Sequence, residues 1–270
     1  MDTIRRAGLR SGMIAVVALV PLIVAACGGA GNATPPVIYI TPAPPTLAPG
    51  ATPTPEPPGP SITNTLISTS APDGKWTVLF KKPAVSGSGD AISKVNDAIS
   101  AKVSGYIDTF TKGDLPAVAS GASPSSLDGN YTVAMDTGSI VSLRFTILAT
   151  LSGAAHSTVN AGGMSFSLST GAQLTFDDIF SNTGDAAKVL ADKTQSALSA
   201  SLGSDLKWPG NATDITFYEN AWVVTPAGLE ITWNEGQIAS DAAGTPSVVI
   251  SWSDLKSVLK SDSPVAGLAG

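Results

Sequence analysis

The stretch SIVSLRFTI, residues 139–147, alternates apolar and polar side chains and predicts a β-strand with one buried face. The expected buried side carries Val141, Leu143, Phe145 and Ile147. The same alternation recurs in MSFSLSTGAQLTFDDIF, residues 164–180, where Thr170-Gly171 is a turn signal. Two such stretches in succession indicate antiparallel strands that are solvated on one face.

The remaining elements can be placed outward from these strands. Strands are expected at 62–68, 76–82, 222–224, 229–233 and 247–250, helices at 92–110, 185–202 and 251–259, and a polar loop at 119–129. The first helix rests on apolar residues that recur at i, i+3, i+4 and i+7. Strands interleaved with helices in this order predict an α+β fold, an antiparallel sheet with helices packed on one face. Both halves run strand–helix–strand, so a division into two lobes stays open.

The first 27 residues have the composition of an export signal. A short basic segment precedes an apolar run from Met13 to Ala26, which has 14 residues. This run is shorter than the ~20 residues that a membrane-spanning helix needs. Residues 24–27, VAAC, resemble a bacterial lipobox, and in lipoproteins the cysteine at this place is lipidated and becomes the first mature residue. We therefore expect residues 1–26 to be a signal peptide and Cys27 to carry lipid, with a plain secretory signal as the alternative.

The segment after Cys27 is rich in proline and threonine. Eleven of the 20 prolines fall between residues 35 and 60. Such a composition buries too little apolar surface to offset chain entropy, so residues 27–60 are expected to form a disordered tether. A folded domain is expected at 61–262 and a flexible tail at 263–270. The lipid on Cys27 would hold this domain at the bilayer, on the extracytoplasmic side of a bacterial cell membrane.

Charge and composition exclude several classes of function. A net charge of −6 does not suit a nucleic-acid-binding protein, which needs a basic surface. The single cysteine and single histidine exclude an intrachain disulfide and a metal site built from several histidines or thiolates. No metal and no cofactor is therefore expected.

One short motif suggests catalysis. Asp136-Thr137-Gly138-Ser139 resembles the active-site loop of aspartic proteases, in which two carboxylates share a proton. The chain has no second motif of this kind, and Asp and Gly are ordinary residues of a hairpin turn. The hairpin turn is therefore the preferred interpretation, and no catalytic residue is assigned.

Five other residues are candidates for binding a partner: His156, Asp177, Asp178, Trp208 and Glu235. His156 is expected to hydrogen-bond loop backbone, and the two aspartates to begin a short helical turn. Trp208 lies next to Pro209-Gly210 and is the tryptophan expected to be most exposed, whereas Trp222 and Trp233 are expected in the core.

Several segments together resemble a known extracytoplasmic domain. They are VNDAIS from Val95, the two alternating stretches above, Gly153-Ala154-Ala155-His156, WVVTPAGLEITW at 222–233 and SDAAGTPSVVISWSDLK at 240–256. In this order they are similar to the C-terminal domain shared by RsiV-type anti-sigma factors and PdaC-type peptidoglycan deacetylases. The resemblance implies an envelope binding module for a protein such as lysozyme or for peptidoglycan. A hydrolase acting on the cell wall through Asp136, His156 or Asp177 is the alternative.

Overall fold

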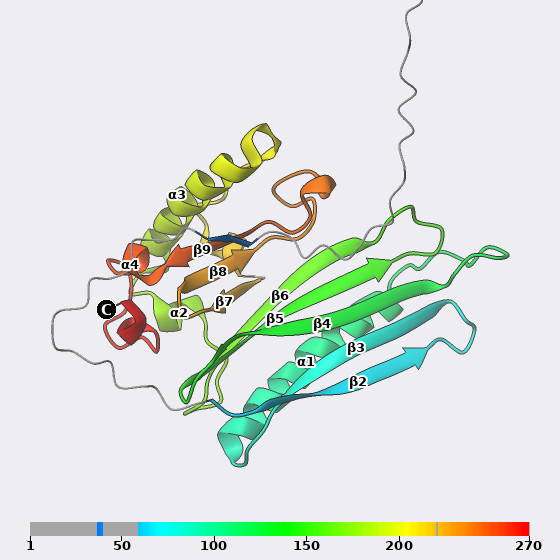
Figure 1. Ribbon diagram of the computed structural model, residues 1–270, viewed down its shortest axis with the longest axis horizontal. Coiled ribbons are helices and arrows are strands. Elements are labelled where there is room, and N and C mark those ends of the chain that lie inside the picture. The colour runs from blue at the N-terminus through cyan, green and yellow to red at the C-terminus, as the bar shows by residue number, and fades with distance from the viewer. Residues whose placement is uncertain (1–36, 40–58, 220, 270) are drawn as a thin grey trace, which may run out of the picture. The chain divides into compact units, whose positions relative to one another are not determined.

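The computed structural model describes residues 37–39, 59–219 and 221–269, which belong to a single compact unit beginning at Pro35. They form two β-sheets, each with its own hydrophobic core and its own long helix (Figure 1). The fold is therefore α+β, as predicted. We call the sheet β2-β3-β4-β5-β6 the large sheet and the sheet β1-β9-β8-β7 the small sheet.

The large sheet is built by the first half of the described chain. Its elements are β2 (Ile62–Ser70), β3 (Trp76–Val85), α1 (Asp90–Thr111), β4 (Ser125–Asp136), β5 (Ile140–Thr150) and β6 (Thr158–Ser167). Neighbouring strands are antiparallel except β3 and β4, which are parallel. The expected purely antiparallel sheet is thus corrected to a mixed one. The reason is α1, since a helical crossover returns the chain in its original direction.

Helix α1 covers one face of the large sheet. Its buried stripe of Val95, Ile99 and Val103 packs on the alternating apolar residues of β3 to β6. Asn96 adds a polar clamp, because its amide accepts from Val85 N at 2.8 Å and donates to Val85 O at 2.9 Å. The apolar residues that follow the helical period and those that follow the strand alternation therefore pack together in one core.

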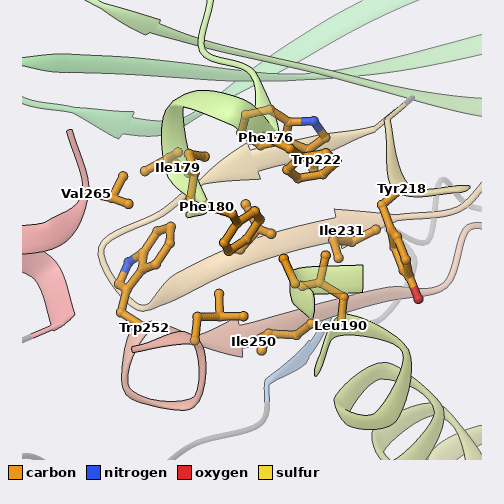
Figure 2. Packing of buried hydrophobic residues seen from close by; sticks show 14 of the residues in the cluster. Phe176, Ile179, Phe180, Leu190, Tyr218, Trp222, Ile231, Ile250, Trp252 and Val265 are labelled. Carbon is orange, nitrogen blue, oxygen red and sulfur yellow. The ribbon is translucent and has the colours of Figure 1, made fainter. Parts of the chain in front are cut away.

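The small sheet and its helices use the second half of the chain together with one short N-terminal strand. The elements are α2 (Phe176–Ile179), α3 (Thr183–Leu202), η1 (Gly203–Asp205), η2 (Ile215–Tyr218), β7 (Trp222–Val224), β8 (Gly228–Thr232), η3 (Asp241–Ala243), β9 (Ser247–Ser251), α4 (Trp252–Leu255), η4 (Ala266–Ala269) and β1 (Val37–Tyr39). Aromatic side chains fill the core of this part (Figure 2). Trp222 and Trp233 are both buried there, as expected from the alternation.

The two sheets meet through small and polar residues. Gly163 of β6 lies so close to Trp222 of β7 that a Cβ would overlap the tryptophan backbone. Ser165 of β6 accepts from Val224 N at 3.0 Å and from Ser142 Oγ at 2.9 Å. The guanidinium of Arg144 on β5 is ion-paired with Glu230 on β8, whose side chain is only 2% exposed.

The sequence pattern predicts neither β4 nor the first part of β6. Residues 125–129 were expected in a loop, but they are the first half of β4, and β6 begins at Thr158 rather than at Met164. In β4 the inward position Gly129 is covered by the ring of Phe80, so the apolar signal of this segment is reduced to Leu127. In β6, Gly162 and Gly163 interrupt the apolar alternation because Tyr106 and Trp222 approach their backbone.

The ends of the expected domain also differ. Residues 37–39, predicted to lie in the disordered tether, form β1, which pairs in parallel with β9. The predicted last helix ends at Leu255 instead of Leu259. The tail expected from residue 263 carries Val265 and Ala269, which are buried in the core of the small sheet. Apolar residues too sparse to show periodicity are held here by tertiary packing.

Candidate functional site

The face of the large sheet opposite α1 carries several exposed side chains. The small sheet covers the end of this face that carries Ser142, Arg144 and Ser165, through the contacts described above. None of the described elements covers the rest. We call this uncovered part the open face, and it consists of Leu66, Ser68, Thr77, Leu79, Lys81, Ser126, Asp128, Asn130, Thr132, Thr146 and Leu148.

Strand register places these residues in rows across the sheet. One row runs from Ser68 through Leu79 and Asp128 to Leu148, and a neighbouring row pairs Leu66 with Lys81. Leu79 is 46% exposed and Leu66 is 56% exposed. Hydroxyl and amide side chains surround them. The open face thus combines exposed apolar area with hydrogen-bonding groups, a composition suited to contact with another macromolecule.

Arg144 marks the boundary between the covered and the open part. Its side chain is 25% exposed, and it donates to Thr132 Oγ1 at 3.3 Å as well as pairing with Glu230. Glu230 also accepts from Ser247 Oγ at 3.1 Å. The buried Nε of Arg144 has no hydrogen-bond partner among the described residues. The primary role of this pair is to join the sheets.

Glu235 covers one edge of the large sheet. Its carboxylate accepts from Val159 N at 2.6 Å, and its own N–H donates to Val159 O at 3.2 Å. Asn234 Oδ1 accepts from Ala161 N at 2.8 Å. These bonds satisfy the outward backbone groups at the start of β6, so Glu235 is held by an intramolecular contact.

His156 lies in the loop just before β6 and is exposed. Its Nδ1 is 3.2 Å from the carbonyl of Ser157, which confirms the expected bond to loop backbone. This end of β6 is also the end that Glu235 covers.

Asp177 and Asp178 lie at the other end of β6. Both are exposed on α2, and Asp178 closes a capping box by accepting from Thr175 N at 2.8 Å. This confirms the predicted helical turn. Leu174, just before it, bonds to Ser165, six residues along β6 from Val159. At ~3.3 Å per residue the two groups of candidates are separated by about 20 Å.

Trp208 is half-buried and is more exposed than Trp222 and Trp233, as expected. Its ring meets Phe217 and Trp233 edge-on, with centroids 5.8 and 6.3 Å away. It therefore forms the rim of the aromatic core of the small sheet.

Asp136 ends β4 at the turn into β5. Thr137 N donates to Ile140 O at 2.9 Å, so the Asp-Thr-Gly-Ser motif is the hairpin turn that was preferred. Partial burial raises the pKa of the Asp136 carboxyl.

The described ranges contain neither a cluster of metal-binding side chains nor a membrane-spanning helix. Within residues 59–219 and 221–269, no three His, Cys, Asp or Glu side chains cluster as a metal site would require. In the same ranges no helix has the length and hydropathy to cross a bilayer. Cys27, with its predicted lipid, lies outside the described residues.

A small hollow of about 310 Å³ lies where β6, α2 and β7 meet. Gly163, Thr175, Glu219 and Trp222 are among its lining residues.

These features define the class of protein: a two-sheet α+β domain with an open face on its large sheet. Residues 177–253 match the DUF3298 family, described as a protein of unknown function. No curated protein matches the chain significantly in sequence.

Two solved structures resemble the fold. A member of the DUF3298 family from Bacteroides fragilis has 13% identity and a TM-score of 0.57, covering 79% of this chain and 98% of its own. A DUF3298 family protein from Pseudomonas aeruginosa has 13% identity and a TM-score of 0.50, covering 77% of this chain and 96% of its own. The shared fold therefore extends beyond residues 177–253 into the large sheet.

The sequence did not reveal the open face as a site. Six of its eleven residues lie on β4 and on the outward positions of β5, where serine, threonine and asparagine are typical of solvated strands and of loops alike. The only signal was the pair of leucines, Leu66 and Leu79, at positions that the structure leaves exposed.

Proposed function

We propose that the chain is a cell-envelope binding lipoprotein. A lipid on Cys27 holds it at the extracytoplasmic side of a bacterial membrane, the proline-rich segment spaces it from the surface, and the folded domain binds a basic protein such as lysozyme. The observation that carries the binding role is the open face: apolar and hydrogen-bonding side chains share an uncovered sheet surface whose reverse side is sealed by α1.

Charge supports a basic partner. The whole chain carries −6, and residues 1–26 carry Arg5, Arg6 and Arg10 against Asp2, a local +2, so the remainder carries −6 − 2 = −8. A negative field of this kind accelerates encounter with a cationic protein and weakens as salt is added. The contact itself would be made by Leu79, Asp128 and their neighbours.

The hydrolase alternative receives no support from the geometry. Asp136 is part of a hairpin turn, and His156 and Asp177 belong to opposite ends of β6. A shared catalytic centre would require these groups within a few ångströms of one another.

Calorimetric titration with lysozyme at low and moderate salt tests the proposal. Asp128→Lys on the open face is compared with Asp97→Lys on α1, since both change the charge equally but on opposite sides of the sheet. We expect micromolar binding that Asp128→Lys weakens by about tenfold more than Asp97→Lys. Absence of binding at about 50 µM contradicts the lysozyme assignment, and equal effects of the two variants exclude the open face as the contact.

A further inference from the structure

The two edges of the large sheet differ in whether their outward backbone groups have hydrogen-bond partners among the described residues. At β6 the side chains of Asn234 and Glu235 occupy the outward backbone groups, as described above. At the opposite edge, β2 extends over nine residues, and none of the described residues pairs with its outer side. A long edge strand without such protection is a template for adding another strand.

The alternation of hydrogen bonds identifies which residues face outward. Ser86 N donates to Ser61 O, and Ala71 N donates to Trp76 O, so the odd-numbered residues of β2 bond to β3. The backbone N–H and C=O groups of the even-numbered residues then point away from the sheet. These residues are Ile62, Asn64, Leu66, Ser68 and Ser70.

This outward set is symmetric about Leu66. An antiparallel copy of the same strand, centred on Leu66, would place Ile62 opposite Ser70 and Asn64 opposite Ser68, with Leu66 facing itself. All five outward residues would then be paired, giving about ten new backbone hydrogen bonds. The Leu66 side chains of the two copies would meet at the two-fold axis, on the same side of the sheet as the open face.

The absence of charged side chains along β2 permits two copies of this strand to pair. A two-fold contact brings identical surfaces together, so any charged residue on the edge would face its own kind or a near neighbour. Residues 57–72 contain no charged side chain, although the chain as a whole carries −6. In the centred register the Asp73 turn of one copy lies beside the Pro60 end of the other, so the acidic turns do not meet.

The chain preceding β2 is a poor alternative occupant. Residues 40–58 contain eight prolines, which lack the N–H that a paired strand must donate. We propose that β2 is a homodimerisation edge: two copies join their large sheets antiparallel about Leu66. This inference does not depend on the identity of the partner bound by the open face.

Sedimentation of residues 35–270, the compact unit, tests the proposal over about 5–200 µM, because a single strand edge buries little surface and the dimer should be weak. We expect the weight-average mass to rise toward twice the monomer value. Leu66→Lys should raise the dissociation constant by about tenfold or more, since two ammonium groups would face each other. Leu79→Lys, which changes another exposed leucine one strand further in, should leave the dissociation constant unchanged.

Two further measurements separate folding from pairing. Leu66→Pro removes an N–H that no intrachain ladder bond uses, so it should keep the far-ultraviolet spectrum of the wild type but abolish dimerisation. In membranes from cells expressing the full chain, Leu66→Cys should form a disulfide-linked dimer under oxidation, while Leu79→Cys and the wild type, which retains Cys27, should not. A monomer at every concentration, or a dimer that Leu66→Lys and Leu79→Lys affect equally, overturns the proposal.

Discussion

Glu230→Gln removes the buried carboxylate that joins the two sheets, and we expect it to destabilise the domain. Glu230 is 2% exposed and accepts hydrogen bonds from Arg144 and from Ser247. Removing one partner of a buried ion pair costs ~3–5 kcal/mol, because the other charge stays buried without compensation. Arg144 keeps 25% of its side-chain surface, so water can partly rehydrate it. We therefore expect a loss near the lower limit, about 3 kcal/mol.

Urea unfolding of residues 35–270 measures this loss. Four of the five tryptophans lie between residues 208 and 252, so fluorescence reports mainly on the small-sheet part, while far-ultraviolet circular dichroism reports on both sheets. For a domain of this size a loss of 3 kcal/mol corresponds to a fall in melting temperature of roughly 6–12 °C. Glu219→Gln makes the same chemical change at an exposed carboxylate and should leave the free energy of unfolding nearly unchanged.

A double variant distinguishes lost charge pairing from lost packing. Arg144→Met combined with Glu230→Met removes both charges and should recover much of the stability that Glu230→Gln loses. The reasoning is refuted if Glu230→Gln costs less than about 1 kcal/mol, or if the double variant is no more stable than the single one.

Two other predictions concern close contacts. Gly163→Ala would force a Cβ into the Trp222 backbone and should cost about 2 kcal/mol or more in urea unfolding, whereas Gly210→Ala, where the added atom meets open space, should cost little. Burial raises the pKa of Tyr106 to about 12, and its hydroxyl has no partner among the described residues. The unfolded chain therefore ionises this group first, so its stabilising effect is complete below pH ~10 and is lost toward pH 12. Tyr106→Phe should be as stable as the wild type at pH 7 and should lose less stability between pH 10 and 12; an identical alkaline loss would contradict the assignment.

The sequence predicted the elements whose side chains repeat with a clear period. Helix α1 follows the apolar spacing from Ile92 to Phe110, and β5 follows the alternation of residues 141–147. The turn at Asp136 and the helical turn at Asp177 were predicted from local sequence as well, since capping and turn residues act through bonds to nearby backbone.

The candidate site was predicted less well. His156, Asp177, Asp178 and Glu235 are now seen at two ends of β6, because spacing along a chain does not determine which strand ends share an edge. The open face was missed since solvated strand positions carry the same serine, threonine and asparagine as loops do.

The sequence by itself determined the α+β class and most of the strands and helices, and its export and tether pattern predicts an envelope lipoprotein, because each depends on local composition or period. Only the tertiary structure decided the parallel pairing of β3 with β4, the burial of Val265 at the C-terminal end and the joining of the sheets through Arg144 and Glu230. These features depend on contacts between residues far apart in the chain, 86 positions for Arg144 and Glu230, whose energies no local pattern records. The open face and the free edge of β2 arise in the same way, from what the rest of the described chain does not cover.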